Sequence, residues 1–171
     1  MGTECHSTEG GIPSASNVWD LLAHATRDRT GFTAGFLATV DAEGRPRVRA
    51  VILRDADPSA ATVSFATDVR SAKIRDIQLR PAVELALYDP ERMLQLRLSG
   101  TADIVADPEI RAKRWANLAP HTRERFELIE NFAWVTISVT SCDWLDLAAE
   151  PPRRFRMTVA PGQHGTREIA P

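Results

Sequence analysis

The stretch from Met93 to Ile104 alternates apolar and polar side chains with a period of two. Leu94, Leu96 and Leu98 recur at every second position, and the residues between them are polar. In an extended chain successive side chains point to opposite faces, so this pattern predicts a strand with one buried and one exposed face. A chain with such a strand has to pair it within a sheet.

Other segments repeat the extended pattern, and turn residues separate them. Strands are expected at 32–40, 47–53, 62–67, 83–88, 134–139 and 143–147, and the turn at 41–44 makes a hairpin of the first two. Helices are expected at 16–30 with Ser16 as N-cap, at 72–79 between Ser71 and Pro81, at 107–118 and at 120–129. About six strands joined mostly by hairpins predict a mainly β (α+β) fold, an antiparallel β-barrel with inserted helices.

Size and charge limit the remaining possibilities. The 171 residues fit one domain, expected at 14–160, with residues 1–13 lacking fixed structure and 161–171 forming a C-terminal tail. The 21 basic and 23 acidic residues give a formal charge of −2, so no overall charge draws nucleic acid or a membrane surface, and any anion site must be local. The two cysteines and four histidines lack metal-ligand spacing. With neither a secretory segment nor a membrane span, a cytoplasmic location is expected.

Arg49 and Arg54 bracket a short apolar run on the second expected strand. Arg49 shares a face with Val51 and Leu53, whereas Arg54 points to the opposite side. An arginine on an apolar strand face needs an anionic partner. That partner is either a carboxylate such as Asp68, in a structural ion pair, or the phosphate of a ligand.

The start of the helix at 72–79 is the second part of this candidate site. A helix N-terminus offers free backbone N–H groups, and Ser71 adds a hydroxyl donor. Lys73 in the first turn is unfavourable beside the positive end of the helix dipole unless an anion lies nearby. The alternative is that Lys73 points into water. Together, the two cation positions predict a phosphate site.

Three segments in this order resemble the FMN-binding split barrel of the pyridoxamine 5'-phosphate oxidase family, in its short, oxidase-related branch. They are the runs 49–54, 65–73 and 95–100, and the resemblance extends from about Phe32 to Arg154. It implies an antiparallel split β-barrel of the FMN-binding type, FMN as cofactor and a homodimer with the cofactor at the subunit interface.

The resemblance also implies roles for individual residues. Arg49 and Lys73 would hold the FMN phosphate with help from Ser71, Val51 and Ile52 would border the flavin ring with the backbone near Arg54, and Thr67 would lie along the ribityl chain or ring edge. Gln95 would hydrogen-bond the cofactor. Trp144 and Arg154 are ten residues apart, as are a flavin-contacting Trp and Arg in the oxidases. For Trp144, a buried strand aromatic is the alternative. The implied cofactor-binding set is Arg49, Ala50, Val51, Ile52, Leu53, Arg54, Ala66, Thr67, Ser71, Ala72, Lys73, Gln95, Trp144 and Arg154.

The sequence departs from the family at the cofactor phosphate and where substrate would bind. Ala72 stands where the oxidases carry a second phosphate-binding arginine, and Glu150 and Pro152 stand where an Arg-x-His pair would hold the substrate phosphate. The region after Gly100 also lacks the family's substrate cluster. The cofactor is therefore expected, but the vitamin substrate is not, and no catalytic residue is identified.

Three functions agree with these observations. The first is a dimeric FMN-dependent oxidoreductase acting on a small molecule of unknown identity. The second is a flavin-binding module without turnover, such as a carrier, a sensor or a relic of a stress-related reductase. The third is a small barrel that binds nucleic acid through Arg45, Arg47, Arg49 and Arg97, although no aromatic residues interleave with these arginines.

Overall fold

The computed structural model describes residues 11–159 and 165–171, and all statements on the fold refer to these residues. The helices are α1 (Ala15–Asp28), α2 (Ala72–Leu79), α3 (Pro108–Ala116) and α4 (Pro120–Arg123), with 3-10 turns η1 (Glu124–Phe126) and η2 (Ile129–Asn131). The strands are β1 (Ala34–Val40), β2 (Pro46–Asp57), β3 (Thr62–Asp68), β4 (Ala82–Asp89), β5 (Leu94–Ile104), β6 (Phe132–Asp146), β7 (Arg153–Thr158) and β8 (Gly165–Ile169).

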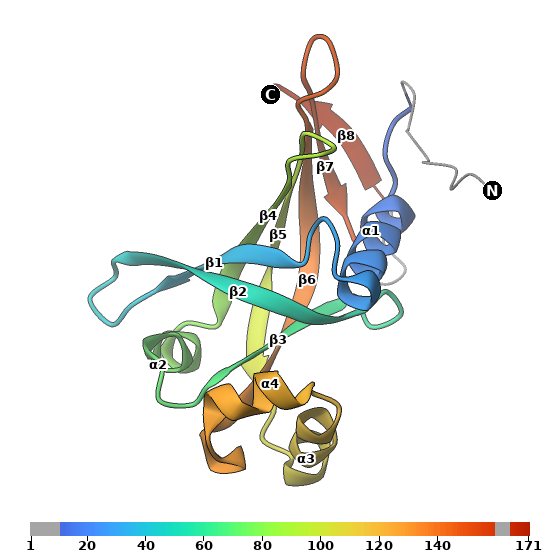
Figure 1. The fold of residues 1–171 in the computed structure, drawn as a ribbon. Helices are drawn as coiled ribbons and strands as arrows, with labels where there is room; N and C mark the ends of the chain where they lie inside the picture. The colour runs from blue at the N-terminus through green and yellow to red at the C-terminus, as the bar shows by residue number, and fades with distance from the viewer. Residues whose placement is uncertain (1–10, 160–164) are drawn as a thin grey trace, which may run out of the picture.

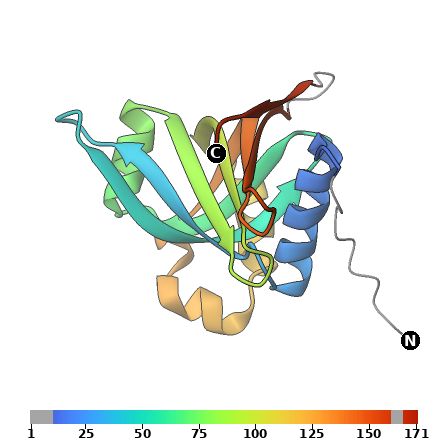
Figure 2. The ribbon, with the colours of Figure 1, turned by 90° about the horizontal axis from the view of Figure 1, so that it is seen from above.

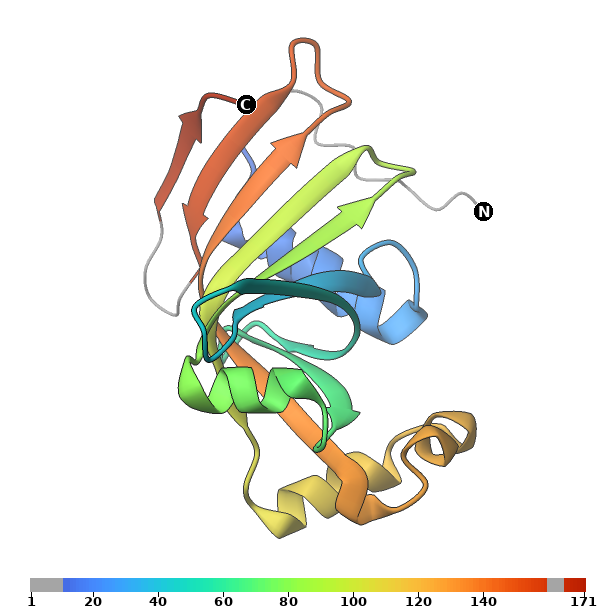
Figure 3. The ribbon, with the colours of Figure 1, turned by 90° about the vertical axis from the view of Figure 1, so that its left-hand side faces the viewer.

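The strands form one antiparallel sheet that closes on itself. Their order is β3-β2-β1-β4-β5-β6-β7-β8, and an additional pairing of β3 with β6 closes the first six into a barrel (Figure 1 and Figure 2). β7 and β8 continue the sheet beyond this closure (Figure 3). The structure therefore confirms the antiparallel split barrel with helical elements.

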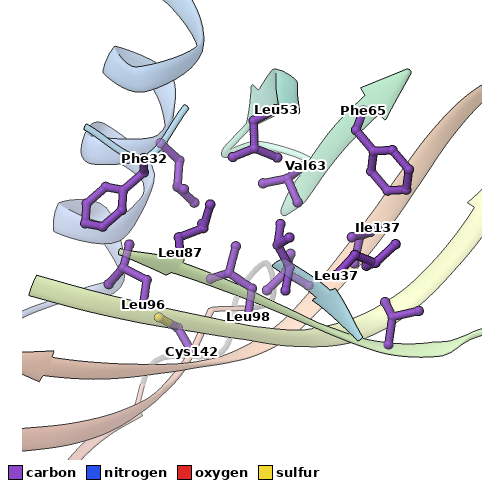
Figure 4. Close-up of a cluster of buried hydrophobic side chains, with 14 of the residues drawn as sticks. Phe32, Leu37, Leu53, Val63, Phe65, Leu87, Leu96, Leu98, Ile137 and Cys142 are labelled. Atoms are coloured by element: carbon purple, nitrogen blue, oxygen red, sulfur yellow. The ribbon is translucent and has the colours of Figure 1, made fainter. Parts of the chain in front are cut away.

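The alternation in the sequence places the core. Leu94, Leu96 and Leu98 of β5 are buried as predicted, and they join a cluster that fills the barrel (Figure 4). α1 covers the barrel with a buried stripe that includes Val18 and Leu22. Ser14 caps α1, in a capping box with Asn17. The expected cap at Ser16 is wrong by one half turn, because the helix begins at Ala15.

Several expected boundaries differ from the observed ones. The two strands expected at 134–139 and 143–147 are one strand, β6, because its middle residues continue the ladders to β5 and β7. β2 runs on to Asp57 past a bulge after Leu53. Residues 165–169 of the expected tail pair with β7. The expected N-terminal segment falls mostly on residues 1–10, which lie outside the described part of the chain.

A helical lobe lies below the barrel, next to β3 and the start of β6 (Figure 1). It contains α3, α4 and the two 3-10 turns, and it packs around Trp115, Phe126, Phe132 and Trp134. Edge-to-face ring contacts join the first three of these residues, with centroid distances of 5.3 to 6.0 Å. The helix expected at 120–129 is interrupted, since α4 ends at Arg123 and gives way to η1 and η2. None of the helices in the described ranges is long and apolar enough to span a bilayer.

Candidate functional site

The two arginines on β2 face opposite sides of the strand, as predicted. Val51 and Leu53, on the face of Arg49, are buried, and Ile52, on the face of Arg54, is 39% exposed. The two arginines therefore meet different surroundings. Arg49 points toward helix α2, and Arg54 points to a cavity between the barrel and the helical lobe.

Arg49 has a carboxylate partner within the chain. Its Nη2 lies 3.1 Å from Oδ2 of Asp76 on α2, and its Nη1 donates to Oγ1 of Thr39 on β1 at 2.5 Å. The Thr39 hydroxyl in turn donates to Asp76 at 2.7 Å. Asp76 is 6% exposed, so this is a largely buried network that ties α2 to two strands. The ion-pair interpretation of Arg49 is confirmed, but the partner is Asp76, since Asp68 pairs with Arg70.

Lys73 has no such partner. Its Nζ donates to Oγ1 of Thr67 on β3 at 2.8 Å, and no carboxylate of the described residues lies within ion-pair distance of it. Burial, and then the nearby charge of Arg49, lower the pKa of Lys73 below its ordinary value of 10.5. The side chain is half-buried, so the alternative that Lys73 points into water is wrong.

The N-terminus of α2 begins where the sequence predicts. Ser71 is the N-cap, but its side chain makes no capping hydrogen bond, and its Oγ lies 3.4 Å from Oγ1 of Thr67. The first backbone N–H groups of α2 therefore lack a side-chain acceptor from Ser71. Lys73, Ser71 and Thr67 bring donors and one uncompensated charge to the same place, which is the arrangement that an anion needs.

A cavity of about 230 Å³ opens beside Lys73 and Thr67. Seven of its ten lining residues belong to the predicted cofactor set, and the other three come from the helical lobe. The lining residues are Ala50, Val51, Ile52, Arg54, Ala66, Thr67, Lys73, Thr122, Arg125 and Phe126.

Sequence reasoning missed Thr122, Arg125 and Phe126. They belong to the region after Gly100, where no copy of the family's substrate cluster was found. Phe126 is held by the aromatic contacts of the lobe, and this packing carries the flanking residues to the cavity. The signal was weak, because no residue pattern in the sequence shows that the lobe folds back onto β2 and β3.

Arg54 is the second uncompensated cation at the cavity. Its Nε is buried and makes no hydrogen bond within the described structure. Burial, and then the charges of Arg29 and Arg125, lower the pKa of Arg54. Arg29 itself donates to the backbone carbonyl of Leu53 at 3.0 Å. A half-buried guanidinium among like charges is costly unless an anion completes the site.

Gln95 and Arg154 lie away from this cavity. They share one row of the outer sheet face, because Gln95 pairs with Leu145, and Leu145 pairs with Arg154. The turns next to these residues, between β4 and β5 and between β6 and β7, are at the end of the molecule opposite α3 and α4 (Figure 1 and Figure 3). A single chain therefore does not bring them to the cavity.

Trp144 occupies the other face of β6. It is 5% exposed and packs in the barrel core, so the structure supports the interpretation as a buried aromatic. The residue that lies between Gln95 and Arg154 on their own face is Leu145. Leu53 is also in the core (Figure 4), and Ala72 is exposed at the start of α2, so neither lines the cavity.

The residues at the cavity fit a flavin mononucleotide. Lys73, Thr67 and the start of α2 supply donors for a phosphate, and Val51, Ile52 and Ala66 supply an apolar wall for a ring. None of the ten lining residues is a carboxylate that would repel the phosphate. The chemistry of the donors therefore agrees with the cofactor that the sequence implies.

Solved structures with the same fold include flavoproteins. A pyridoxamine 5'-phosphate oxidase-related, FMN-binding protein from Nostoc punctiforme aligns with a TM-score of 0.80 at 23% identity, over 94% of this chain and 100% of its own. PhzG from Burkholderia lata, solved with tetrahydrophenazine-1-carboxylic acid, aligns with a TM-score of 0.74 at 18% identity over the whole of both chains. A heme-binding protein from Mycobacterium smegmatis aligns with a TM-score of 0.57 at 19% identity, over 92% of this chain and 59% of its own. At these identities the likeness establishes the fold alone.

Sequence comparisons identify the family to which the chain belongs. A pyridoxine/pyridoxamine 5'-phosphate oxidase from Anaeromyxobacter dehalogenans is 38% identical over 77 residues, 45% of this chain and 38% of the relative. One from Rhodopseudomonas palustris is 32% identical over 107 residues, 60% of this chain and 50% of the relative. These matches cover half or less of the curated relatives. The profile described as "Pyridoxamine 5'-phosphate oxidase, FMN-binding domain" matches residues 16–106, more than half of the 171 residues. The chain therefore belongs to the pyridoxamine 5'-phosphate oxidase-related family of FMN-binding proteins.

Proposed function

We propose that the protein is an FMN-dependent oxidoreductase that works as a homodimer and acts on a small organic anion. The observation that carries this proposal is the pair of uncompensated cations, Lys73 and Arg54, at one cavity with an apolar wall. When bound, the flavin supplies the electron or hydride transfer, and the protein supplies position and electrostatics.

The phosphate of the cofactor is held at the start of α2. Lys73 supplies the charge, Thr67 and Ser71 supply hydroxyls, and the first N–H groups of the helix point to the same anion. Arg49 takes part as a donor whose charge Asp76 already balances. Phosphate binding therefore depends more on the charge of Lys73 than on that of Arg49.

The opposite part of the cavity receives the substrate. Arg54 and Arg125 offer guanidinium groups to a carboxylate or phosphate, which such groups bind in a bidentate manner. Ile52 and Phe126 exclude water beside them. The anion of the substrate would be fixed there while the flavin reacts with the rest of the molecule.

A second copy of the chain completes the site. The cavity volume of about 230 Å³ is below the roughly 300 to 1,000 Å³ that is usual for sites of small molecules. Beside it, Phe36, Val48 and Ile52 are 57%, 65% and 39% exposed on one outer face of β1 and β2. An exposed apolar patch of this kind marks an interface. In a dimer docked there we expect Gln95 and Arg154 of one copy to reach the cavity of the other, as the family resemblance implies.

The experiment starts from the purified protein. We expect it to be yellow, to release FMN on denaturation, and to elute as a dimer. Its FMN should be reduced by a nicotinamide donor and reoxidised by oxygen or by a second substrate. A colourless protein that fails to bind added FMN would refute the proposal. The expected cytoplasmic location stays a prediction, which cell fractionation can test.

The alternative is a flavin-binding module without turnover. It is favoured by the composition of the cavity, in which the ionisable lining residues are Arg54, Lys73 and Arg125, so that no carboxylate, histidine or cysteine lines it. Proteins of this fold also include the heme-binding protein and an F420 reductase with a TM-score of 0.51 at 24% identity, over 66% of this chain and 90% of its own. Bound FMN that no donor reduces at a useful rate would favour this alternative.

A further inference from the structure

Asp143 on β6 is surrounded by three arginines. Its carboxylate, 7% exposed, accepts from Arg97 at 2.5 Å, from Arg154 at 2.6 Å and from Arg156 at 2.7 and 3.1 Å. These hydrogen bonds, above all those from Arg156, hold the pKa of Asp143 well below its usual range. One negative charge thus gathers three positive charges on the outer face of β5, β6 and β7.

The three arginines differ in how fully they are engaged. Arg156 contacts both carboxylate oxygens, and its side chain is 47% exposed. Arg97 lies between Asp143 and Glu84, whose Oε1 is 3.6 Å from its Nε. Arg154 gives a single hydrogen bond, from Nη2, and its side chain is 22% exposed. Its other donors have no acceptor within the described residues, and its Nε is buried.

Arg154 is also the arginine of this group that lies in the row of Gln95. The row runs from Gln95 through Leu145 to Arg154, and Asp143 precedes Leu145 by two residues, so its side chain lies on the same face. Without Asp143, three guanidinium groups on neighbouring strands would repel one another, and Arg154 would lose its anchor. A long side chain without an anchor populates many rotamers.

We propose that Asp143 is a positioning residue for the cofactor site. It holds Arg154 in the row of Gln95 with free donors, so that a second copy of the chain meets a fixed guanidinium at its flavin. This inference rests on the proposed function, because it needs FMN and the dimer. It assigns Asp143 no contact with the cofactor.

A double-mutant cycle on the full-length dimer tests the proposal. The variants are D143N, R154Q and D143N/R154Q, and the dissociation constant of FMN is measured for each. D143N and R154Q should each weaken binding by roughly 5- to 30-fold, the factor that one or two kcal/mol represents. The double variant should be no weaker than R154Q alone, because Asp143 acts through Arg154. D143N should also change the visible circular dichroism of the bound flavin.

Arg156 supplies the matched control, since it contacts the same carboxylate but lies outside the row of Gln95. R156Q should leave FMN affinity within about twofold, inside the usual error of additivity. Three outcomes would each overturn the inference. The losses of FMN affinity in D143N and R154Q could add in the double variant, or D143N could bind FMN as tightly as wild type. R156Q could also lose as much FMN affinity as R154Q. If D143N does not fold, the double variant D143N/R156Q replaces it, and its FMN affinity is compared with that of R156Q. The double variant removes one of the three arginines that D143N leaves without a counterion.

The outcomes separate this inference from the proposed function. If wild-type protein binds no FMN, both the proposed function and this inference fail. If wild-type protein binds FMN, and K73A and R154Q both weaken that binding but D143N does not, the inference alone fails.

Discussion

Two groups of cations in this molecule differ in what balances them. Arg49, Arg97, Arg154 and Arg156 contact a buried carboxylate of their own chain, either Asp76 or Asp143. Lys73 and Arg54 contact none within the described residues, although the chain as a whole carries more acidic than basic residues. Two half-buried cations without a carboxylate partner in the described part of the chain therefore lie at one cavity. The buried carboxylates balance the charge of the paired cations, whereas Lys73 and Arg54 leave an anion site.

The largest expected effect concerns a paired cation. Arg49→Ala should lower the free energy of unfolding by about 3 kcal/mol, because it leaves Asp76 buried without its counterion. Chemical denaturation of the apo protein measures this. Arg49→Ala/Asp76→Ala is the control, and it should recover part of the loss, since removing both partners costs less than removing one. A single variant as stable as wild type would remove Arg49 from the paired group.

Lys73 should show the opposite behaviour. Lys73→Ala should weaken FMN binding by about 1.5 to 3 kcal/mol, the scale of hydrogen bonds to charged groups. It should leave the apo protein as stable as wild type or slightly more stable, because it removes a half-buried charge. Fluorescence titration of FMN measures the first effect, and thermal unfolding measures the second. The chain offers one matched control, because Lys113 is its only other lysine and lies exposed on α3. If Lys113→Ala weakens FMN binding as much as Lys73→Ala, the loss reflects the net charge of the protein and not a contact of Lys73 with the phosphate.

Arg54 is the second cation at the cavity without a carboxylate partner among the described residues. Arg54→Gln should leave the apo protein as stable as wild type, or more stable by up to about 1 kcal/mol, because it relieves the repulsion from Arg29 and Arg125. Thermal unfolding of the apo protein measures this change. A clear loss of stability would show that Arg54 has a structural partner and belongs to the paired group.

The smallest effect is on pH dependence. The pKa of Lys73 is lowered in the free protein, so Lys73 loses its proton at a pH below its ordinary 10.5. FMN affinity should therefore fall as the pH rises through this lowered pKa, and Lys73→Ala should abolish that decline. Over the same range the apo protein should gain stability, since the buried charge disappears. An FMN affinity that does not change with pH in the alkaline range would contradict this assignment of the charge.

Local patterns in the sequence were sufficient for much of the fold. Ser71 and Pro81 mark the ends of α2, and the structure begins and ends that helix where they predict. The alternation of β5 likewise placed its leucines in the core. β6 was divided in two because its polar residues at 140–141 resemble a turn, whereas the ladders to β5 and β7 hold the chain extended there.

The site was predictable only where its residues lie close in sequence. Arg54, Ser71 and Lys73 were found from strand ends and one helix start, and the family resemblance added Ala50, Val51, Ile52, Ala66 and Thr67. Asp76 as the partner of Arg49, and Arg125 as the neighbour of Arg54, depend on packing between distant segments. Trp144 was placed by its spacing to Arg154, but the spacing does not determine the strand face, and the register turns its side chain to the core.

The most direct test of the central claim compares FMN with riboflavin, which lacks only the phosphate. If uncompensated charge at Lys73 binds that phosphate, wild-type protein should bind FMN at least tenfold more tightly than riboflavin, a difference of about 1.4 kcal/mol. Lys73→Ala should bring the two affinities close together. Equal affinities of wild-type protein for FMN and riboflavin would contradict the account.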